Sequence, residues 1–152
     1  MNPGKMFEQD FAKSAPEWLE VIRLVDSGGW GKADELRFTP SNICDFIAFS
    51  EKTHRLYKLE LKSVAGKSLP FGNINRKKLD KLCEKVTFLI QPSIVINYRK
   101  VNQTYLIPAR EVQAFMNLGE RKSVPLDWAD EYGTIIIQTL KRVRYKYDLE
   151  WL

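Results

Sequence analysis

The sequence predicts a single α/β domain with a central mixed sheet flanked by helices. Its length of 152 residues is typical of one domain with one core. A hydrophobic fraction of 44% and a charged fraction of 28% are typical of a globular chain. Helix-like and strand-like segments alternate along it, with no repeat, low-complexity tract or interdomain linker. We therefore expect residues 1–152 to form one domain.

The N-terminal part predicts one helix followed by three strands. A short amphipathic helix is expected over residues 4–15, because Phe7 and Phe11 share a helical face and Pro16 stops the helix. Strands are expected over residues 18–25, 43–49 and 55–63, which are rich in apolar and β-branched side chains. Between the first two strands, Gly28, Gly29 and Gly31 favour an irregular loop.

The C-terminal part predicts two further helices and a second group of strands. A loop over residues 64–73 should lead into a helix over residues 74–86. Residues 93–99 and 104–109 predict paired strands, and residues 109–118 predict the next helix. The tail from residue 133 contains a probable strand, then a basic stretch and an apolar end. Its segment 141–147 alternates basic with apolar or aromatic residues, which favours an edge strand with a basic face.

Nothing in the sequence predicts secretion or a membrane span. No apolar run approaches the roughly 20 residues that cross a bilayer. The first ten residues lack the basic-then-apolar pattern of a signal peptide. Cys44 and Cys83 are too few for a metal cluster and are expected to be free thiols. We expect a cytoplasmic protein, within a bacterial host cell if it is phage-encoded, with no membrane partner and no nucleotide cofactor.

Positive charge is concentrated in the middle of the chain. The net charge is +5, with a pI near 9.2. From Lys52 to Lys81 there are nine lysines and arginines against Glu60 and Asp80, a net +7. Such a stretch suits a polyanion, because each phosphate that it neutralises releases condensed counterions. It is equally consistent with a solvated basic face, so charge alone does not decide between them.

Two carboxylates on neighbouring predicted strands are the candidate catalytic residues. Asp45 lies in the apolar segment "ICDFIAF", where a buried carboxylate is costly unless it is paired or holds a cation. Glu60 and Lys62 alternate with apolar residues in "LYKLELKS" and should share a face. A hairpin around "SEKTHR" would bring Asp45 beside Glu60.

Adjacent carboxylates repel, so a cation is expected between them, namely Mg²⁺, with Mn²⁺ able to substitute. The Leu61 carbonyl is a further candidate ligand, and Lys62 could orient a metal-bound water. An acid followed by Glu-X-Lys also occurs by chance, on strands with an alternating charged face. Three features favour the catalytic interpretation: the two apolar strands joined by a short turn, the basic surroundings, and Glu8 on the upstream helix.

The Asp…Glu-X-Lys pattern is the signature of the PD-(D/E)XK nuclease superfamily. Beyond that pattern, the chain resembles the RecU-type Holliday junction resolvases, especially their shorter phage-encoded members. The resemblance covers nearly the whole chain. It is carried by "GKMFEQDF", "RFTPSNICDFIAF", "LYKLELKSVAGKSLPF", "INRKKLDKL", "TYLIPAREV" and "LKRVRYKYDLEWL".

The resemblance implies a restriction-endonuclease-like core and a homodimer. It also implies Mg²⁺-dependent resolution of four-way DNA junctions by paired, symmetric nicks. Asp45, Glu60 and Lys62 match the family's catalytic motif, and Glu8 matches the acid of its first helix. Residues 28–38 occupy the place of the stalk that such enzymes insert into the junction centre.

The chain departs from the family at two places. In related enzymes the helix after the catalytic strand often carries a glutamine near the metal, whereas here Lys78 takes that place. Lys78 could contact the scissile phosphate or be solvated. The segment at the stalk position is short and glycine-rich, with only Lys32 and Arg37 as basic residues.

Further candidate DNA contacts are basic residues outside the catalytic motif. A solvated surface is the competing interpretation for each of them. The candidates are Lys32, Arg37, Lys67, Arg76, Lys77, Lys78, Lys81, Lys141, Arg142 and Arg144.

Two other functions remain open at the level of sequence. One is a different PD-(D/E)XK nuclease that cuts duplex or other branched DNA. The second is a non-catalytic DNA-binding module, for which replacing Asp45 would leave every property intact or strengthen DNA binding.

Overall fold

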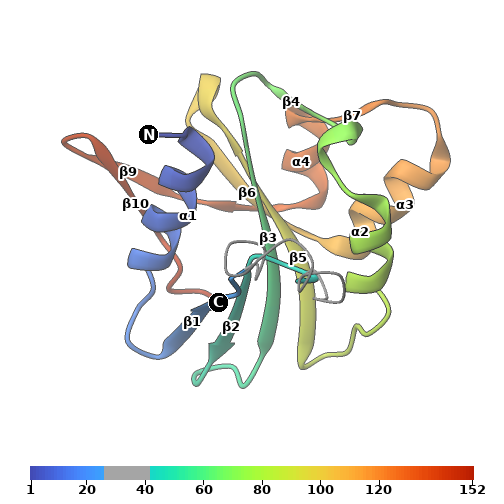
Figure 1. Cartoon of the computed structure of the whole chain (residues 1–152). Helices are drawn as coiled ribbons and strands as arrows, with labels where there is room; N and C mark the ends of the chain where they lie inside the picture. The colour runs from blue at the N-terminus through green and yellow to red at the C-terminus, as the bar shows by residue number, and fades with distance from the viewer. Residues whose placement is uncertain (26–41) are drawn as a thin grey trace, which may run out of the picture.

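A computed structural model describes residues 1–25 and 42–152 (Figure 1). Its centre is a six-stranded sheet of order β1-β2-β3-β5-β6-β8. These strands are β1 (Leu19–Arg23), β2 (Phe46–Ser50), β3 (Leu56–Val64), β5 (Ile90–Tyr98), β6 (Gln103–Pro108) and β8 (Thr134–Ile136). The β3–β5 pair is parallel and the other four pairs are antiparallel. The expected mixed central sheet is therefore confirmed.

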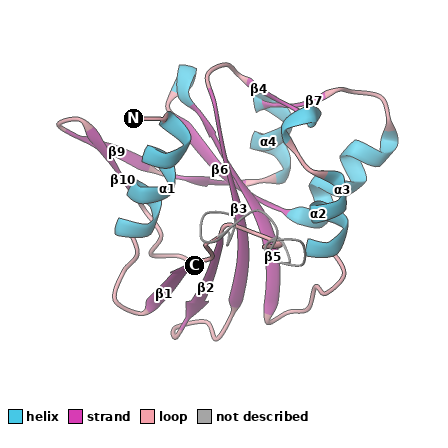
Figure 2. Cartoon of the chain, viewed as in Figure 1, coloured by secondary structure: helices cyan, strands magenta, loops and turns pink. Residues whose placement is uncertain are grey.

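Helices cover both faces of this sheet (Figure 2). The helix α1 (Pro3–Lys13) packs on one face, and α2 (Arg76–Leu82), α3 (Ala109–Leu118) and α4 (Leu126–Tyr132) lie on the other. Period-two alternation explains the division. On β3, Tyr57, Leu59 and Leu61 are buried on the α1 face. Glu60 and Lys62 therefore point toward the face that α2 covers.

The first helix follows from its capping residues and its aromatic stripe. The Asn2 side chain accepts a hydrogen bond from the backbone N–H of Gly4, and Pro3 occupies the first turn, where a missing N–H costs little. Phe7 and Phe11 are buried and pack edge-on or tilted against Tyr147 from the C-terminal region. The helix is thereby held on the sheet by residues from the other end of the chain.

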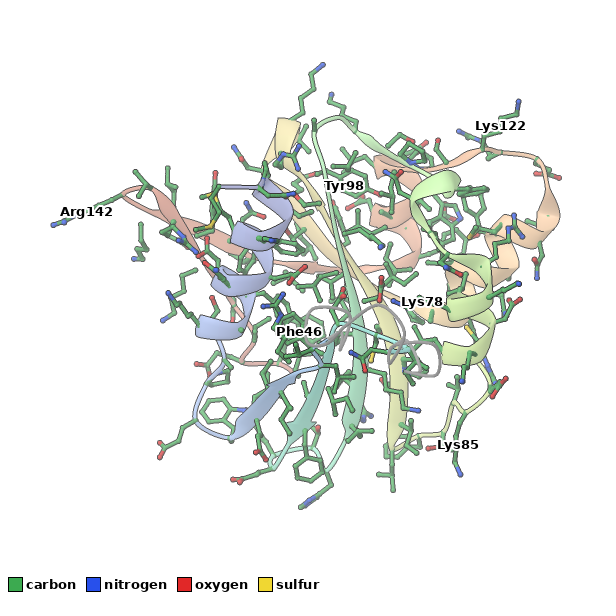
Figure 3. The ribbon with its side chains drawn as sticks, in the orientation of Figure 1. Phe46, Lys78, Lys85, Tyr98, Lys122 and Arg142 are labelled. Atoms are coloured by element: carbon green, nitrogen blue, oxygen red, sulfur yellow. The ribbon has the colours of Figure 1, made fainter. Side chains whose placement is uncertain are left out.

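The C-terminal basic stretch forms a hairpin separate from the main sheet. Strands β9 (Gln138–Lys141) and β10 (Arg144–Tyr147) pair in antiparallel fashion. The expectation of one edge strand over residues 141–147 is thus wrong, because the chain turns at Arg142, whose φ is 59°. Arg142 projects from the hairpin tip (Figure 3), whereas Tyr147 is buried as expected.

Several other expectations need correction. Residues 64–73 include β4 (Ser68–Pro70), which pairs with β7 (Ser123–Pro125), and the 3₁₀ turn Phe71–Asn73, so they are not simply a loop. The expected helix over residues 74–86 ends at Leu82. The helix α4 was not expected, since the about two turns of "LDWADEY" leave little helical periodicity to detect. The predicted helix over residues 109–118 is confirmed.

The remaining expectations concern the stalk, membrane spans and cysteines. The segment 28–38 lies outside the described residues. In residues 1–25 and 42–152, no helix is both long and apolar enough to cross a bilayer. Cys44 and Cys83 are free and buried, as expected.

Candidate active site

Asp45 directly precedes β2 and is held to β3 by two hydrogen bonds. Its backbone N–H donates to the Leu59 carbonyl at 2.9 Å, and its Oδ2 accepts from the Leu61 N–H at 2.7 Å. These bonds bracket Glu60 on the partner strand. Leu59 already pairs with Phe46 in the sheet register, so the extra bond from Asp45 marks a bulge-like irregularity. Asp45 therefore precedes the strand in which it was expected to lie.

The environment of the Asp45 carboxyl favours its neutral form. Burial and, as the second-largest cause, the negative charge of Glu60 raise its pKa from 3.8 to about 6. The charge of Glu8 also raises the pKa of Asp45. The hydrogen bond from the Leu61 N–H lowers it, and the charge of Lys62 lowers it by a smaller amount. The same four side chains that the sequence singled out thus interact electrostatically.

Glu60 lies between two ammonium groups. Its Oε1 is 2.9 Å from the Nζ of Lys62, and its Oε2 is 4.0 Å from the Nζ of Lys78 on α2. The Glu60 side chain is only 14% exposed. Its Oε2 is buried and finds no hydrogen-bond donor among the described residues. An acceptor of this kind is costly to bury unless another group satisfies it.

These residues line a small hollow between β3 and α2. Glu60, Lys62, Asn75 and Lys78 are on its wall, with apolar side chains such as Ile94 closing the back. Its volume of about 20 Å³ is room for about one water molecule or one ion. Asn75 was not singled out from the sequence. It is the N-cap of α2, where its Oδ1 accepts from the Lys78 N–H, and an Asn directly before a helix was the available signal.

The donor set fits a single Mg²⁺ held by two carboxylates. The unsatisfied Oε2 of Glu60 and the charged form of Asp45 are both groups that a divalent cation would stabilise. Mg²⁺ keeps several waters, so one or two carboxylates suffice. Within residues 1–25 and 42–152, no group of three or more His, Cys, Asp or Glu side chains converges on one point. A site built by Asp45 and Glu60, with the Leu61 backbone beside them, would thus be small.

Glu8 is near this cluster but already has a partner. Its Oε2 lies 2.8 Å from the Nη2 of Arg23 on β1, and its side chain is 22% exposed. The influence of Glu8 on the pKa of Asp45 places its charge within reach of the site. Arg23 was not singled out from the sequence, since one arginine in an edge strand carries no distinctive pattern.

Cys44 is buried directly beside the two acids. Burial, followed by the negative charges of Glu60 and Asp45, raises the pKa of its thiol to about 11. Its Sγ donates to the Phe46 carbonyl at 3.3 Å. The thiol is therefore protonated at neutral pH and serves as a small packing group rather than as a nucleophile.

The predicted DNA contacts are distributed over several elements. Lys67, Lys77, Lys81, Lys141 and Arg142 are exposed. Arg76 donates to Asn117 Oδ1 and the Met116 carbonyl, and thereby joins α2 to α3. Arg144 forms a 2.6 Å ion pair with the buried Asp10. Lys32 and Arg37 lie outside the described residues.

Comparison with known proteins adds one distant relative. No protein-family model matches the chain. It is 25% identical over 168 aligned residues to the SPbeta prophage-derived uncharacterized protein YotM of Bacillus subtilis (strain 168). The alignment covers 99% of this chain and 85% of the relative. This chain is thus similar, over its whole length, to a protein of prophage origin.

Proposed function

We propose that the protein is a Mg²⁺-dependent endodeoxyribonuclease of the PD-(D/E)XK type that resolves four-way DNA junctions. The observation that carries the proposal is the buried, unsatisfied Oε2 of Glu60 beside Asp45 and between two lysines. A strand that merely displayed charges to solvent would not bury a carboxylate oxygen without a donor. The central mixed sheet flanked by helices is compatible with a restriction-endonuclease-like core.

The roles of the residues follow from their positions. Asp45 and Glu60 would hold the cation, and the Asp45–Leu61 hydrogen bond keeps the two strands in register. When bound, Mg²⁺ would supply positive charge to the phosphate and would lower the pKa of a coordinated water. Lys62, held at 2.9 Å from Glu60, can orient the attacking water and assist its deprotonation. Attack at phosphorus breaks the bond to the 3′-oxygen and leaves a 5′-phosphate.

Lys78 supplies a fixed positive charge at the same site. Its Nζ is 4.0 Å from Glu60 Oε2, on the side of the carboxylate opposite to Lys62. A second divalent ion would find few carboxylates and would be repelled by two ammonium groups. We therefore propose one Mg²⁺ per site, with Lys78 contacting the scissile phosphate.

Selectivity for a branched substrate would come from shape and phosphate spacing. The net charge of +5 and the exposed lysines of α2 suit a DNA backbone. A homodimer would place two such sites about a two-fold axis, as paired symmetric nicks require.

The decisive experiment is cleavage of a labelled four-way junction and of linear duplex with the same sequence. Wild type and Asp45→Ala would be compared in Mg²⁺, in Mn²⁺ and in EDTA. Paired nicks on the junction, absent from duplex and lost in the variant, are the expected result.

Two other outcomes would each replace the proposal. Equal cutting of duplex would leave a PD-(D/E)XK nuclease of different specificity. Binding without cleavage in either metal, unchanged or strengthened by Asp45→Ala, would leave a non-catalytic DNA-binding module.

A further inference from the structure

A second pocket lies on the other face of the sheet from Glu60, between α1, the end of β5 and the β9–β10 hairpin. Its volume is about 190 Å³, much larger than the hollow beside Glu60. Apolar walls come from Met6, Phe7 and Val143. Polar groups come from Arg99, Asn102 and others considered below. A mostly apolar pocket with a few fixed polar groups is the usual form of a small-ligand site.

Arg99 is the charged group of this pocket that lacks a counter-ion. It is half-buried, and none of the ion pairs among the described residues includes it. The other charged groups of the pocket region are already matched, because Asp10 is paired with Arg144 at 2.6 Å and also accepts from the Tyr145 N–H. The only described partner of the Arg99 guanidinium is the Ser63 hydroxyl, at 2.8 Å. A guanidinium with free N–H groups and no carboxylate is a ready receptor for an anion.

A chain of hydrogen bonds fixes Arg99 in place. Its Nη1 donates to Ser63 Oγ, and Ser63 donates to Asn97 Oδ1 at 3.1 Å. The Asn97 amide then donates to Thr104 at 2.9 Å, and Thr104 donates to Gln138 at 2.6 Å. This ladder of side-chain hydrogen bonds links residues of β3, β5, β6 and β9. A buried polar network in which each member is bonded is rigid, so the guanidinium is preorganised for its ligand.

An aromatic side chain in the pocket lining is also held in position. Tyr145 lines the pocket, and its hydroxyl donates to Asn102 Oδ1 at 2.9 Å. Asn102 has a left-handed backbone, with φ of 51°, at the end of the 3₁₀ turn that begins with Arg99. An uncompensated guanidinium in the same pocket as apolar and aromatic side chains suits one nucleotide, whose phosphate would bind the arginine and whose base would pack on the apolar and aromatic groups.

We propose that this pocket binds one nucleotide of the DNA substrate, other than the nucleotide at the cleavage site. Ser63, which holds Arg99, directly follows Lys62 in β3, and the two side chains point to opposite faces of the sheet. The pocket would therefore engage DNA close to the candidate active site but across the sheet from it. The identity of the ligand as DNA rests on the proposed function, whereas the anion site itself rests on Arg99 alone.

The test is binding of a labelled four-way junction in EDTA, where no metal-dependent cleavage occurs. Arg99→Gln should weaken binding about tenfold, because a charge-assisted contact is lost. The charge-matched control Lys100→Gln, at the exposed neighbouring position, should change binding by about twofold or less. The slope of log affinity against log salt should decrease by about one for Arg99→Gln.

A second pair of variants addresses the pocket without altering the ladder. Val143 is 78% exposed at the hairpin turn, so Val143→Glu adds negative charge at the pocket mouth with little risk to folding. Val143→Glu should weaken binding, and Val143→Thr should not. Equal effects of Arg99→Gln and Lys100→Gln, with no effect of Val143→Glu, would overturn the proposal.

Titration with small molecules distinguishes between the possible ligands of the pocket. Deoxythymidine monophosphate should shift the side-chain amide NMR signals of Asn97, Asn102 and Gln138 in the wild type but not in Arg99→Gln. Equal shifts with inorganic phosphate would refute a nucleotide site. Tight mononucleotide binding without any effect of Arg99→Gln on junction affinity would refute the DNA assignment. Failure of cleavage with Arg99-dependent binding intact would contradict only the nuclease proposal.

Discussion

The Oδ2 atom of Asp45 accepts a hydrogen bond from the Leu61 backbone N–H at 2.7 Å. The negative charge of Glu60, which precedes Leu61, raises the pKa of the same Asp45 carboxyl. The Leu61 N–H thus stabilises the Asp45 carboxylate, whereas the negative charge of the neighbouring Glu60 side chain destabilises it. This balance makes Asp45 the place where stability and the proposed activity are expected to conflict.

Asp45→Asn should stabilise the metal-free protein at neutral pH. The folded-state pKa of Asp45, about 6, is above its ordinary value of 3.8, so the carboxyl favours folding at low pH. That contribution is lost as pH rises from about 4 through about 6. Asparagine keeps an acceptor for the Leu61 N–H without the charge, and we expect a gain of roughly 1 kcal/mol above pH 7. Urea unfolding in EDTA at pH 5 and pH 8 measures this.

The difference between the two proteins should be small at pH 5 and larger at pH 8, and cleavage should be abolished at both. Asp45→Ala serves as a control, because it also removes the hydrogen bond. An Asn variant that is less stable than wild type at pH 8 would show that the carboxylate is not a destabilising group.

Glu60→Gln should lower the pKa of Asp45 and abolish tight binding of a divalent cation. The charge of Glu60 is the second-largest cause that raises the pKa of Asp45, after burial. NMR titration of the Asp45 carboxyl measures the first effect. Mn²⁺ binding followed by electron paramagnetic resonance measures the second, without reference to activity. An unchanged Mn²⁺ affinity would remove Glu60 from the cation site.

Lys78→Gln should separate metal affinity from cleavage. Removing the ammonium 4.0 Å from Glu60 removes a like charge beside the proposed cation, so Mn²⁺ affinity should increase roughly threefold to tenfold. Cleavage should nevertheless decrease, since the variant loses the proposed contact between Lys78 and the scissile phosphate. Lys85→Gln, exposed in the loop after α2, removes the same charge away from the site and should change neither quantity. Equal behaviour of the two variants would show that Lys78 is merely solvated.

Arg144→Met should destabilise the fold more than it weakens DNA binding. Arg144 is paired at 2.6 Å with Asp10, whose side chain is 6% exposed. Removing one partner of a buried pair leaves an uncompensated charge, at a cost of about 3 kcal/mol. Lys146→Met, exposed on the same strand, should cost less than about 0.5 kcal/mol. Chemical denaturation compares the two, and an equal stability of both variants would mean that Asp10 is adequately solvated without Arg144.

Local pattern was sufficient for much of the fold and for the centre of the candidate site. The helix over residues 109–118 was predicted from the sequence and has those ends in the structure, where Gly119 caps it. Period-two alternation likewise placed Glu60 and Lys62 on one face of β3, and the short turn predicted the pairing of β2 with β3.

Tertiary structure decided the features that depend on contacts between distant segments. Arg144 was grouped with the DNA contacts by its basic neighbours, yet its partner Asp10 lies 134 positions away. The buried Glu60 Oε2 and the approach of Lys78 require α2 to pack on β3. Likewise, the ladder from Arg99 to Gln138 joins β3, β5 and β6, which are neighbours in the central sheet, to β9 of the separate hairpin. The sequence by itself determined the first helix, the helix over residues 109–118, the main strands of the central sheet and the face that Glu60 and Lys62 take. Only packing of the chain decided which charges are neutralised and which, like that of Arg99, have no counter-ion among the described residues.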